Sequence, residues 1–220
     1  MFAARLMEKR KKQEVRTTLR ETRRQFGGEP RRQAEAQIDQ ELRALITGHP
    51  AGFIGVYCPF DGEVDISALW GGGLPLTSSH RDPLISRLAF PIHKSGQALS
   101  FVRTTGWIKG GKLPLPQGSP LSLQKLSLII TPGVAFDPET GIRLGLGGGH
   151  YDRTFALSAQ HSWPLSTFGV GFCFQLRSGL PRESWDIPLN GVITESGVQE
   201  ILPHRTASPP QSSLNERETP

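Results

Sequence analysis

The segment that most constrains the fold is residues 128–153, where a short apolar run leads into a glycine-rich loop. Leu128, Ile129 and Ile130 are continuous apolar residues, as in a strand that is covered on both faces. Four glycines follow within residues 145–149, and because glycine has no Cβ, their N–H groups can approach an anion closely. The segment therefore predicts a buried strand that ends in an anion-binding loop.

Charged residues flank this loop on both sides. Arg143 and Arg153 can neutralise phosphate charge, and Asp152 is a hard oxygen ligand of the kind that Mg²⁺ prefers. The combination indicates a nucleotide phosphate and metal site; the alternative is a glycine-rich turn surrounded by solvated charges. No Gly-Lys-Ser/Thr of a Walker loop follows, and His150 stands where the dinucleotide-binding Gly-x-Gly-x-x-Gly pattern needs its last glycine.

The same region resembles the signature of the 5-formyltetrahydrofolate cyclo-ligase family, also called methenyltetrahydrofolate synthetase. The resemblance rests on TPGVAFD at 131–137, the GxRLGxGGG loop at 141–149 and YDR at 151–153. It extends over most of the chain, from about residue 9 to residue 202. It implies ATP- and Mg²⁺-dependent conversion of 5-formyltetrahydrofolate, with or without a polyglutamate tail, to 5,10-methenyltetrahydrofolate, with release of ADP and phosphate.

Size and composition are those of a globular protein. The chain has 220 residues, of which 36% are hydrophobic and 20% charged, which suits one domain with a full core. No apolar stretch of about 18 residues occurs and the N-terminus lacks the apolar region of a secretory signal, so we expect no membrane span and a cytoplasmic location. The two cysteines, Cys58 and Cys173, lie in apolar runs and are expected to be buried thiols and not a disulfide framework.

The excess of positive charge is N-terminal. Residues 1–43 contain 12 of the 25 Lys and Arg but only 7 of the 20 Asp and Glu, which leaves 13 of each in the rest of the chain. A helix is predicted over 5–26, with Lys12, Arg16 and Arg20 along one face. Such a row can bind a polyanion, either the phosphates of one nucleotide or a nucleic-acid backbone; the alternative is a solvated basic face without a ligand.

The resemblance favours the nucleotide, because the family opens with a basic helix whose Lys-x-x-x-Arg pair contacts ATP. Lys12 and Arg16 fit that spacing, although Lys11 and Arg20 could also fill the roles. Nucleic acid is therefore not the expected partner, and RNA binding by the helix is kept only as a rival hypothesis.

Strand-like and helical patterns alternate along the chain after the first helix. A second helical pattern begins after Pro30 and ends at Gly48-His49-Pro50. The predicted strands are 53–58, 88–92, 99–102, 126–131, 167–174 and 191–194, and weaker helical segments are predicted at 65–70, 119–125 and 152–160. This alternation predicts an α/β layered sandwich with a mostly parallel central sheet flanked by helices, Rossmann-like, in a single domain over 1–205. Residues 206–220 are expected to form a disordered tail.

Three acids follow the first predicted strand. Glu63 and Asp65 would share one side of an extended chain, whereas an Asp61-Gly62 turn with a helix-capping acid is the common structural alternative. The resemblance implies that Glu63 binds the folate, because a carboxylate can accept two parallel N–H donors from the pterin. Cys58 and Tyr151 are the other implied substrate contacts.

The implied nucleotide and metal sites come from distant segments. The resemblance gives Mg²⁺ two carboxylates, Asp152 and Asp186, with room for water and phosphate oxygens. The histidines show no metal-ligand spacing, so zinc is not expected. The implied ATP-binding residues are Lys12, Arg16, Arg143, Leu144, Gly145, Leu146, Gly147, Gly148, Gly149, His150 and Tyr151.

No protein nucleophile is expected, since ATP itself would activate the formyl oxygen. Two residues depart from the family pattern: His150 replaces an aromatic residue before Tyr151, and Leu115 replaces a polar residue between two prolines. We expect altered affinity from His150. The rival reading is a diverged, non-catalytic relative that binds nucleotide or folate.

Overall fold

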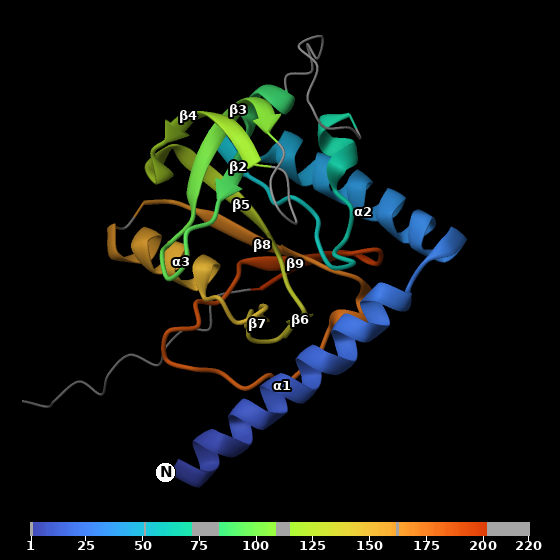
Figure 1. The fold of residues 1–220 in the computed structure, drawn as a ribbon. Coiled ribbons are helices and arrows are strands. Elements are labelled where there is room, and N and C mark those ends of the chain that lie inside the picture. The colour runs from blue at the N-terminus through green and yellow to red at the C-terminus, as the bar shows by residue number, and fades with distance from the viewer. Residues whose placement is uncertain (1, 51, 72–83, 109–114, 162, 202–220) are drawn as a thin grey trace, which may run out of the picture.

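The computed structural model describes residues 2–50, 52–71, 84–108, 115–161 and 163–201. Within them, three α-helices lie around one eight-stranded sheet, and a two-stranded sheet lies beside it (Figure 1). The expected disordered tail, 206–220, falls outside the described residues.

Five parallel strands make the centre of the large sheet, and antiparallel strands extend both of its edges. Across the sheet, the parallel strands are β9 (Gly191–Thr194), β8 (Ser166–Val170), β5 (Leu126–Pro132), β1 (Phe53–Gly55) and β2 (Leu88–Ile92). Beyond β9 lies β10 (Gly197–Glu200), and beyond β2 lie β3 (Ser100–Ile108) and β4 (Leu115–Leu121). The predicted α/β fold with a largely parallel sheet is confirmed.

The order of the parallel strands creates a crevice. Numbered along the chain, the five parallel strands lie in the order second, first, third, fourth and fifth. The chain therefore leaves β1 toward one side for β2, whereas the next parallel strand, β5, lies on the other side of β1. Connections diverge at such a point, and ligands bind outside the carboxyl ends of the strands there. This is not the 3-2-1-4-5-6 order of the dinucleotide-binding fold, so the Rossmann-like part of the prediction is not shown.

Strand β5 is covered on both faces, as its apolar run predicts. Leu128 and Ile130 belong to one core cluster with the buried stripe of α2 (Gly28–Gly48), and Ile129 belongs to another with Phe155 of α3 (His150–His161). The stripe of α2 consists of Ala34, Ile38, Leu42 and Ile46. In Figure 1, α2 and α3 accordingly lie on opposite sides of the sheet.

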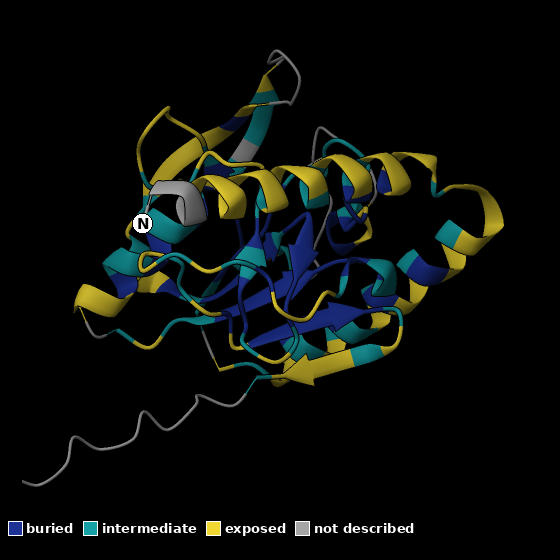
Figure 2. Cartoon of the chain, turned by 90° about the horizontal axis from the view of Figure 1, so that it is seen from below, coloured by how far each residue is buried: buried dark blue, intermediate teal, exposed yellow. Residues whose placement is uncertain are grey.

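Helix α1 (Phe2–Gln25) confirms the predicted basic helix and lies beside the two-stranded sheet of β6 (Ala135–Phe136) and β7 (Arg143–Leu144). Leu19 is its buried anchor and packs with residues of this small sheet, among them Ala135 and Leu144. Figure 2 shows the outward side of α1 exposed and the parallel strands at the centre of the large sheet mostly buried.

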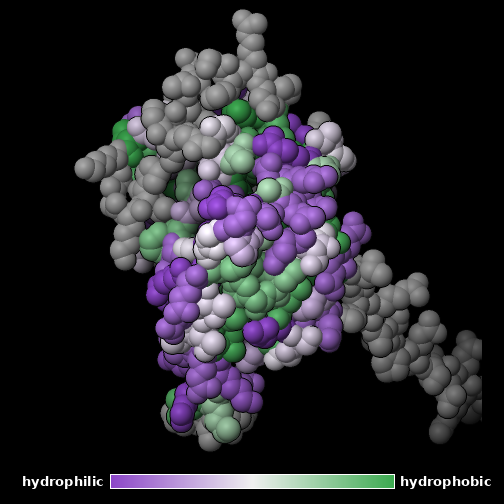
Figure 3. All heavy atoms as spheres, turned by 90° about the vertical axis from the view of Figure 1, so that its right-hand side faces the viewer, coloured by the Kyte–Doolittle hydropathy of each residue, from purple (hydrophilic) through white to green (hydrophobic). Residues whose placement is uncertain are grey.

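Hydrophilic side chains dominate the face seen in Figure 3, where they surround a smaller hydrophobic area. Among the described helices, none combines the length and the apolar character that a membrane crossing needs. Both cysteines are free, as expected, but Cys58 and Cys173 are partly exposed and not fully buried.

Several predicted element boundaries were wrong, both at an edge of the sheet and at its centre. The segment predicted as helical at 119–125 is the end of β4 followed by a short 3₁₀ helix (Leu123–Lys125), and 65–70 holds another 3₁₀ helix (Ser67–Trp70). Strand β4 carries Pro116 and Pro120, which argue against a central strand but are tolerated at an edge. The runs predicted at 53–58 and 167–174 leave the sheet early, at Gly55 and Val170.

Candidate functional site

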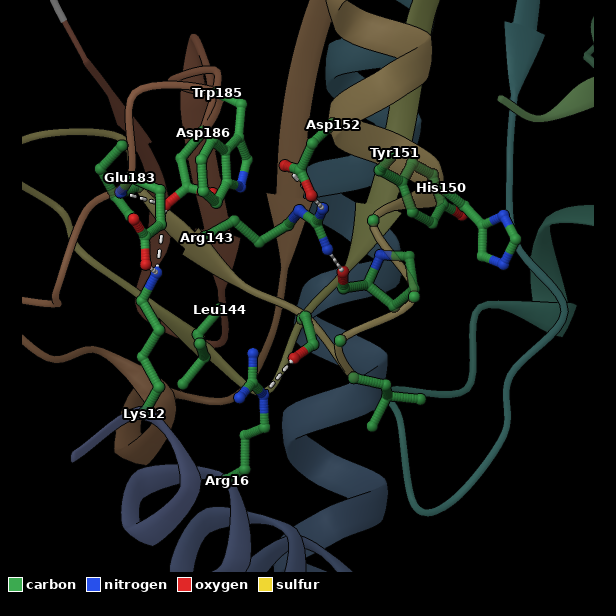
Figure 4. Close-up of a pocket in the computed structure, with 18 of the residues that line it drawn as sticks. Lys12, Arg16, Arg143, Leu144, His150, Tyr151, Asp152, Glu183, Trp185 and Asp186 are labelled. Atoms are coloured by element: carbon green, nitrogen blue, oxygen red, sulfur yellow. Dashed lines mark hydrogen bonds and ion pairs between the residues drawn. The ribbon is translucent and has the colours of Figure 1, made fainter. Parts of the chain in front are cut away.

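A cavity of about 940 Å³ lies at the crevice beside the carboxyl ends of β1 and β5. Its walls come from α1, from the segments after β1, β2 and β5, from the glycine loop, and from residues 181–186 (Figure 4). Every contact implied by the resemblance lines it: Lys12, Arg16, Cys58, Glu63, Arg143, Leu144, Gly145, Leu146, Gly147, Gly148, Gly149, His150, Tyr151, Asp152 and Asp186. Arg153, which the sequence also placed beside the phosphates, does not line it and instead donates to the carbonyl of Gly148. Residues that are far apart in the sequence thus share one cavity.

The glycine loop leads directly into α3. Gly147 and Gly149 have φ angles of 101° and 63°, which favour glycine over any residue with a side chain. A Cβ on Gly148 would lie 2.9 Å from the His150 ring, so a side chain there would require that ring to shift. Because α3 begins at His150, its unpaired N–H groups open at the end of the loop, and this arrangement attracts anions.

Arg143 lines the cavity and contacts both Asp152 and Tyr151. Its side chain is only 6% exposed, its Nη2 donates to Asp152 (3.2 Å to Oδ1), and its guanidinium stacks over the Tyr151 ring at 5.1 Å. The Nε of Arg143 is buried and has no hydrogen-bond partner among the described residues. The guanidinium is therefore held in place by Asp152 and the Tyr151 ring.

Helix α1 contributes Lys12 and Arg16. The Lys12 ammonium lies 3.4 Å from Asp186 and 3.6 Å from Glu183, and Arg16 Nε donates to the carbonyl of Gly145 at 2.9 Å (Figure 4). Burial lowers the pKa of Arg16, and Asp186 partly offsets that effect.

Neither alternative cation lies in the cavity. Lys11 is exposed, and Arg20 turns toward Asp61 instead, with its Nε 2.8 Å from Oδ2.

The segment after β1 contributes Tyr57, Cys58, Phe60 and Glu63 to the cavity, and Glu63 is the acidic residue among them. This side chain is buried, and its Oε2 accepts the N–H of Phe60 at 3.1 Å. Burial raises the pKa of Glu63 to about 7, although Arg23 works against the shift. Burial and the nearby Glu63 raise the pKa of Cys58 to about 12, so its thiol stays protonated and is a poor nucleophile. Burial likewise raises the pKa of Tyr151.

The two acids implied as metal ligands already have cationic partners: Asp152 pairs with Arg143, and Asp186 pairs with Lys12. Among the described residues, no group of three His, Cys, Asp or Glu side chains could hold a metal ion. Two carboxylates nevertheless fit Mg²⁺, which usually takes one or two carboxylates and completes its shell with water and phosphate oxygens.

Sequence reasoning missed several lining residues, namely Leu6, Lys9, His93, Glu183 and Trp185. His93 follows β2, so the rule that ligands bind at strand carboxyl ends could have found it. Its ring lies 5.3 Å from that of His150 and perpendicular to it, and the Nδ1 of His150 is 2.9 Å from the carbonyl of Gln97. Because a carbonyl only accepts, this Nδ1 carries the hydrogen.

Fold and site together define an α/β protein with a cationic, glycine-lined cradle at the switch point of its sheet. The sequence profile described as the 5-formyltetrahydrofolate cyclo-ligase family matches residues 84–195. The 5-formyltetrahydrofolate cyclo-ligase of Haemophilus influenzae is 31% identical over 195 residues, which cover 85% of this chain and 99% of that protein. The Escherichia coli enzyme of the same name is 35% identical over 175 residues, 76% of this chain and 92% of that protein.

A solved structure agrees with these relatives. The NMR structure of Aquifex aeolicus 5,10-methenyltetrahydrofolate synthetase superposes with a TM-score of 0.70 at 27% identity, covering 92% of this chain and 98% of that one. The chain belongs to the 5-formyltetrahydrofolate cyclo-ligase family of enzymes, as its glycine-loop signature predicts.

Proposed function

We propose that this protein converts 5-formyltetrahydrofolate to 5,10-methenyltetrahydrofolate with consumption of ATP, in the presence of Mg²⁺. The observation that carries the proposal is that a single cavity joins the cationic, glycine-lined cradle to the buried carboxyl of Glu63. One end suits the phosphates of ATP and the other a flat, hydrogen-bonding ring, so both reactants would meet inside the cavity.

The phosphate end would be made by Lys12, Arg16, Arg143 and the loop over 145–149. In the structure, Lys12 and Arg143 are paired with carboxylates, and phosphate oxygens form equally strong charge-assisted bonds with such cations. ATP would therefore take over these cations from their acidic partners. The free N–H groups at the start of α3 add to the attraction for the anion.

The acids released by this exchange would be Asp152 and Asp186. Both line the cavity, and both would then need a new cationic partner. They are the residues that would hold Mg²⁺, which, when bound, neutralises phosphate charge during transfer of the phosphoryl group.

The folate end would be made by Glu63, Cys58 and Tyr151. Ionised Glu63 can accept two parallel N–H groups from the aminopyrimidine edge of the pterin. Since burial raises the pKa of Glu63 to about 7, those donors would compensate a carboxylate that is otherwise costly to bury. The neutral Cys58 thiol and the Tyr151 ring would give the flat substrate an apolar wall.

The chemistry needs no protein nucleophile. The formyl oxygen attacks the γ-phosphorus of ATP and ADP leaves. N10 of the folate then attacks the activated formyl carbon, and the C–O bond breaks as phosphate leaves and N10 gives up its proton. The residues of the cavity would align the γ-phosphate with the formyl oxygen and stabilise the charge of the transferring group. We place this reaction in the cytoplasm.

The test is the appearance of methenyltetrahydrofolate absorbance when the protein is mixed with 5-formyltetrahydrofolate, ATP and Mg²⁺. We expect the wild type to form product. Asp152→Asn should turn over about 10- to 100-fold more slowly, the factor that corresponds to losing one charge-assisted contact of about 1.5–3 kcal/mol. Arg32→Gln is a matched surface control, because Arg32 is 69% exposed and pairs only with the exposed Glu29 in the described structure.

A wild type that forms no product would overturn the proposal. If it still bound ATP, the chain would be a diverged nucleotide-binding relative, a reading that the histidine inside the glycine-loop signature favours. Tight, strongly salt-dependent binding of RNA without turnover would favour the rival role for the basic helix. An unchanged rate in Asp152→Asn would remove only the metal assignment.

A further inference from the structure

The turn that follows β1 is docked directly on α1. Phe60 and Glu63 line the cavity, and the N–H of Glu63 donates to the carbonyl of Phe60 at 3.1 Å to close the turn between them. At Gly62 a Cβ would lie 3.1 Å from the backbone oxygen of Arg23 on α1, so helix and turn approach more closely than most side chains would allow.

Asp61, at the tip of this turn, is surrounded by arginines of α1. Its side chain is 6% exposed and forms ion pairs with Arg20 (2.8 Å), Arg23 (3.4 Å) and Arg24. Burial opposes the charge of Asp61, but hydrogen bonds from Arg20 and Arg24 outweigh it, so its pKa lies below the usual value. Among the described residues it is the one non-glycine with positive φ, at 57°. Such strained backbone persists only where the surroundings hold it.

Arg23 connects α1 and the turn after β1 to a third segment that lines the cavity, the end of β5. Its side chain is 1% exposed, its Nε donates to the carbonyl of Asp61 at 3.0 Å, and its Nη1 donates to the carbonyl of Gly133 at 2.9 Å. Gly133 follows β5, lines the cavity, and also accepts a bond from Gln175 at 2.9 Å. One buried guanidinium therefore joins α1, the turn after β1 and the end of β5.

The arginines around Asp61 continue the row that reaches the phosphate end. Lys12, Arg16 and Arg20 follow one another at intervals of four residues and so share a face of α1. A rotation or slide of α1 that moved Lys12 and Arg16 would also break the contacts of Asp61. The position of the cations and the position of Glu63 are thus mechanically linked.

We propose that Asp61 is a positioning residue that couples the two ends of the cavity, so that bound nucleotide strengthens folate binding and bound folate strengthens nucleotide binding by the same factor. The inference rests on the proposed function. Asp61 does not line the cavity and would touch neither ligand; it acts by holding α1 and the Glu63 turn as one unit.

The test measures the dissociation constant of a non-hydrolysable ATP analogue with and without saturating 5-formyltetrahydrofolate, by calorimetry, together with turnover. In the wild type we expect the folate to tighten the analogue about fivefold or more, the lower end of common coupling factors. In Asp61→Asn this factor should fall toward one. The kcat should drop about 10- to 100-fold with a smaller change in either KM, because misplacement of the reactants by about 1 Å can cost that much.

A second variant covers the case in which Asp61→Asn does not fold. Arg20→Gln/Arg24→Gln removes the two more exposed partners, 35% and 53% exposed, and keeps the buried Arg23. It should lower the coupling factor in the same direction, and Arg32→Gln should leave it unchanged. The inference alone would be overturned if the wild type turns over while Asp61→Asn and Arg20→Gln/Arg24→Gln lose only thermal stability and keep the coupling factor. A wild type without turnover would overturn the proposed function and the inference with it.

Discussion

Helices α1 and α2 are neighbours in the sequence and similar in length, 24 and 21 residues, but they are attached to the molecule by different forces. Helix α2 buries an apolar stripe that includes Ile38 and Leu42, both fully buried. Helix α1 has one buried apolar anchor among its described side chains, Leu19, with the partly buried Val15 beside it. Its other contacts are mainly charged ones along the row from Lys12 to Arg24.

The different attachment of the two helices suggests different roles, with α2 stabilising the fold and α1 serving the binding site. Burying an apolar side chain contributes roughly 1.5–3 kcal/mol without specifying direction, whereas an ion pair depends on geometry and can be exchanged for another ion. Helix α2 therefore holds the fold together. Helix α1 offers a charged face that a ligand can compete for, and this suits a wall of a binding site.

The largest effect is expected in α2. Leu42→Ala should lower the free energy of unfolding by about 3 kcal/mol, because it removes a fully buried side chain and leaves a cavity. Denaturant unfolding measures this loss. Below the unfolding transition, nucleotide affinity should stay within about twofold of the wild type. A tenfold loss of affinity would show that α2 does more than stabilise the fold.

The next effect concerns Glu63, whose turn contacts both helices. Asp61 of this turn pairs with Arg20 of α1, and Arg31 of α2 donates to the Glu63 carbonyl at 2.8 Å. The folded pKa of about 7 lies above the unfolded 4.5, so the folded protein keeps a proton that the unfolded chain loses. This contribution to stability is complete below pH 4.5 and is lost as the pH rises through about 7, at a cost of about 3 kcal/mol.

Glu63→Gln should remove this loss. The difference in unfolding free energy between variant and wild type, measured by denaturant titration without ligands, should grow in favour of the variant from pH 4.5 to about pH 8. A difference that stays constant with pH would show that Glu63 is ionised throughout.

A smaller effect is expected at the phosphate end of α1. Lys12→Ala should weaken ATP binding about 10-fold, roughly 1.4 kcal/mol, because one cation of the cradle is lost. The free energy of unfolding should fall by about 1 kcal/mol, because Asp186, only 15% exposed, loses its cationic partner. Lys11→Ala is the matched control, since Lys11 is exposed and does not line the cavity. Equal losses in both variants would contradict the assignment of Lys12.

The smallest effect is the response to salt. Raising the ionic strength from about 0.1 M to about 1 M shortens the Debye length from about 10 Å to about 3 Å. This weakens the ion pairs that solvent reaches, which in α1 are those of Arg20 and Arg24, 35% and 53% exposed. Hydrogen exchange of backbone amides should then become severalfold faster in α1 and remain nearly unchanged in α2. Equal acceleration in both helices would mean that charge is not what distinguishes them.

Local sequence patterns were enough to predict the elements that carry the site. The four-residue spacing of Lys12 and Arg16 placed both on one helix face, and the glycines after β5 marked the loop. The apolar run from Leu128 predicted a strand with two covered faces because continuous hydrophobicity has that meaning in a parallel sheet.

Contacts that depend on strand order could not be predicted. Asp61 meets Arg20 across 41 residues, and no local pattern marks that contact. The rule that ligands bind at strand carboxyl ends points to His93, but it selects β2 over the other strands only once β2 is known to lie beside β1. Strand β4 was missed for a related reason: prolines argue against a strand until its place at the edge of the sheet is known. Whether the lining residues have the implied roles remains a prediction.

Those prolines also affect how the protein behaves among its own copies. A free strand edge is a template on which another chain can add a strand and begin an aggregate. In β4, Pro116 and Pro120 have no N–H to donate, and their rings hinder the close approach of a second backbone. The two prolines that made β4 hard to predict thus disfavour edge-to-edge strand pairing between molecules at high concentration.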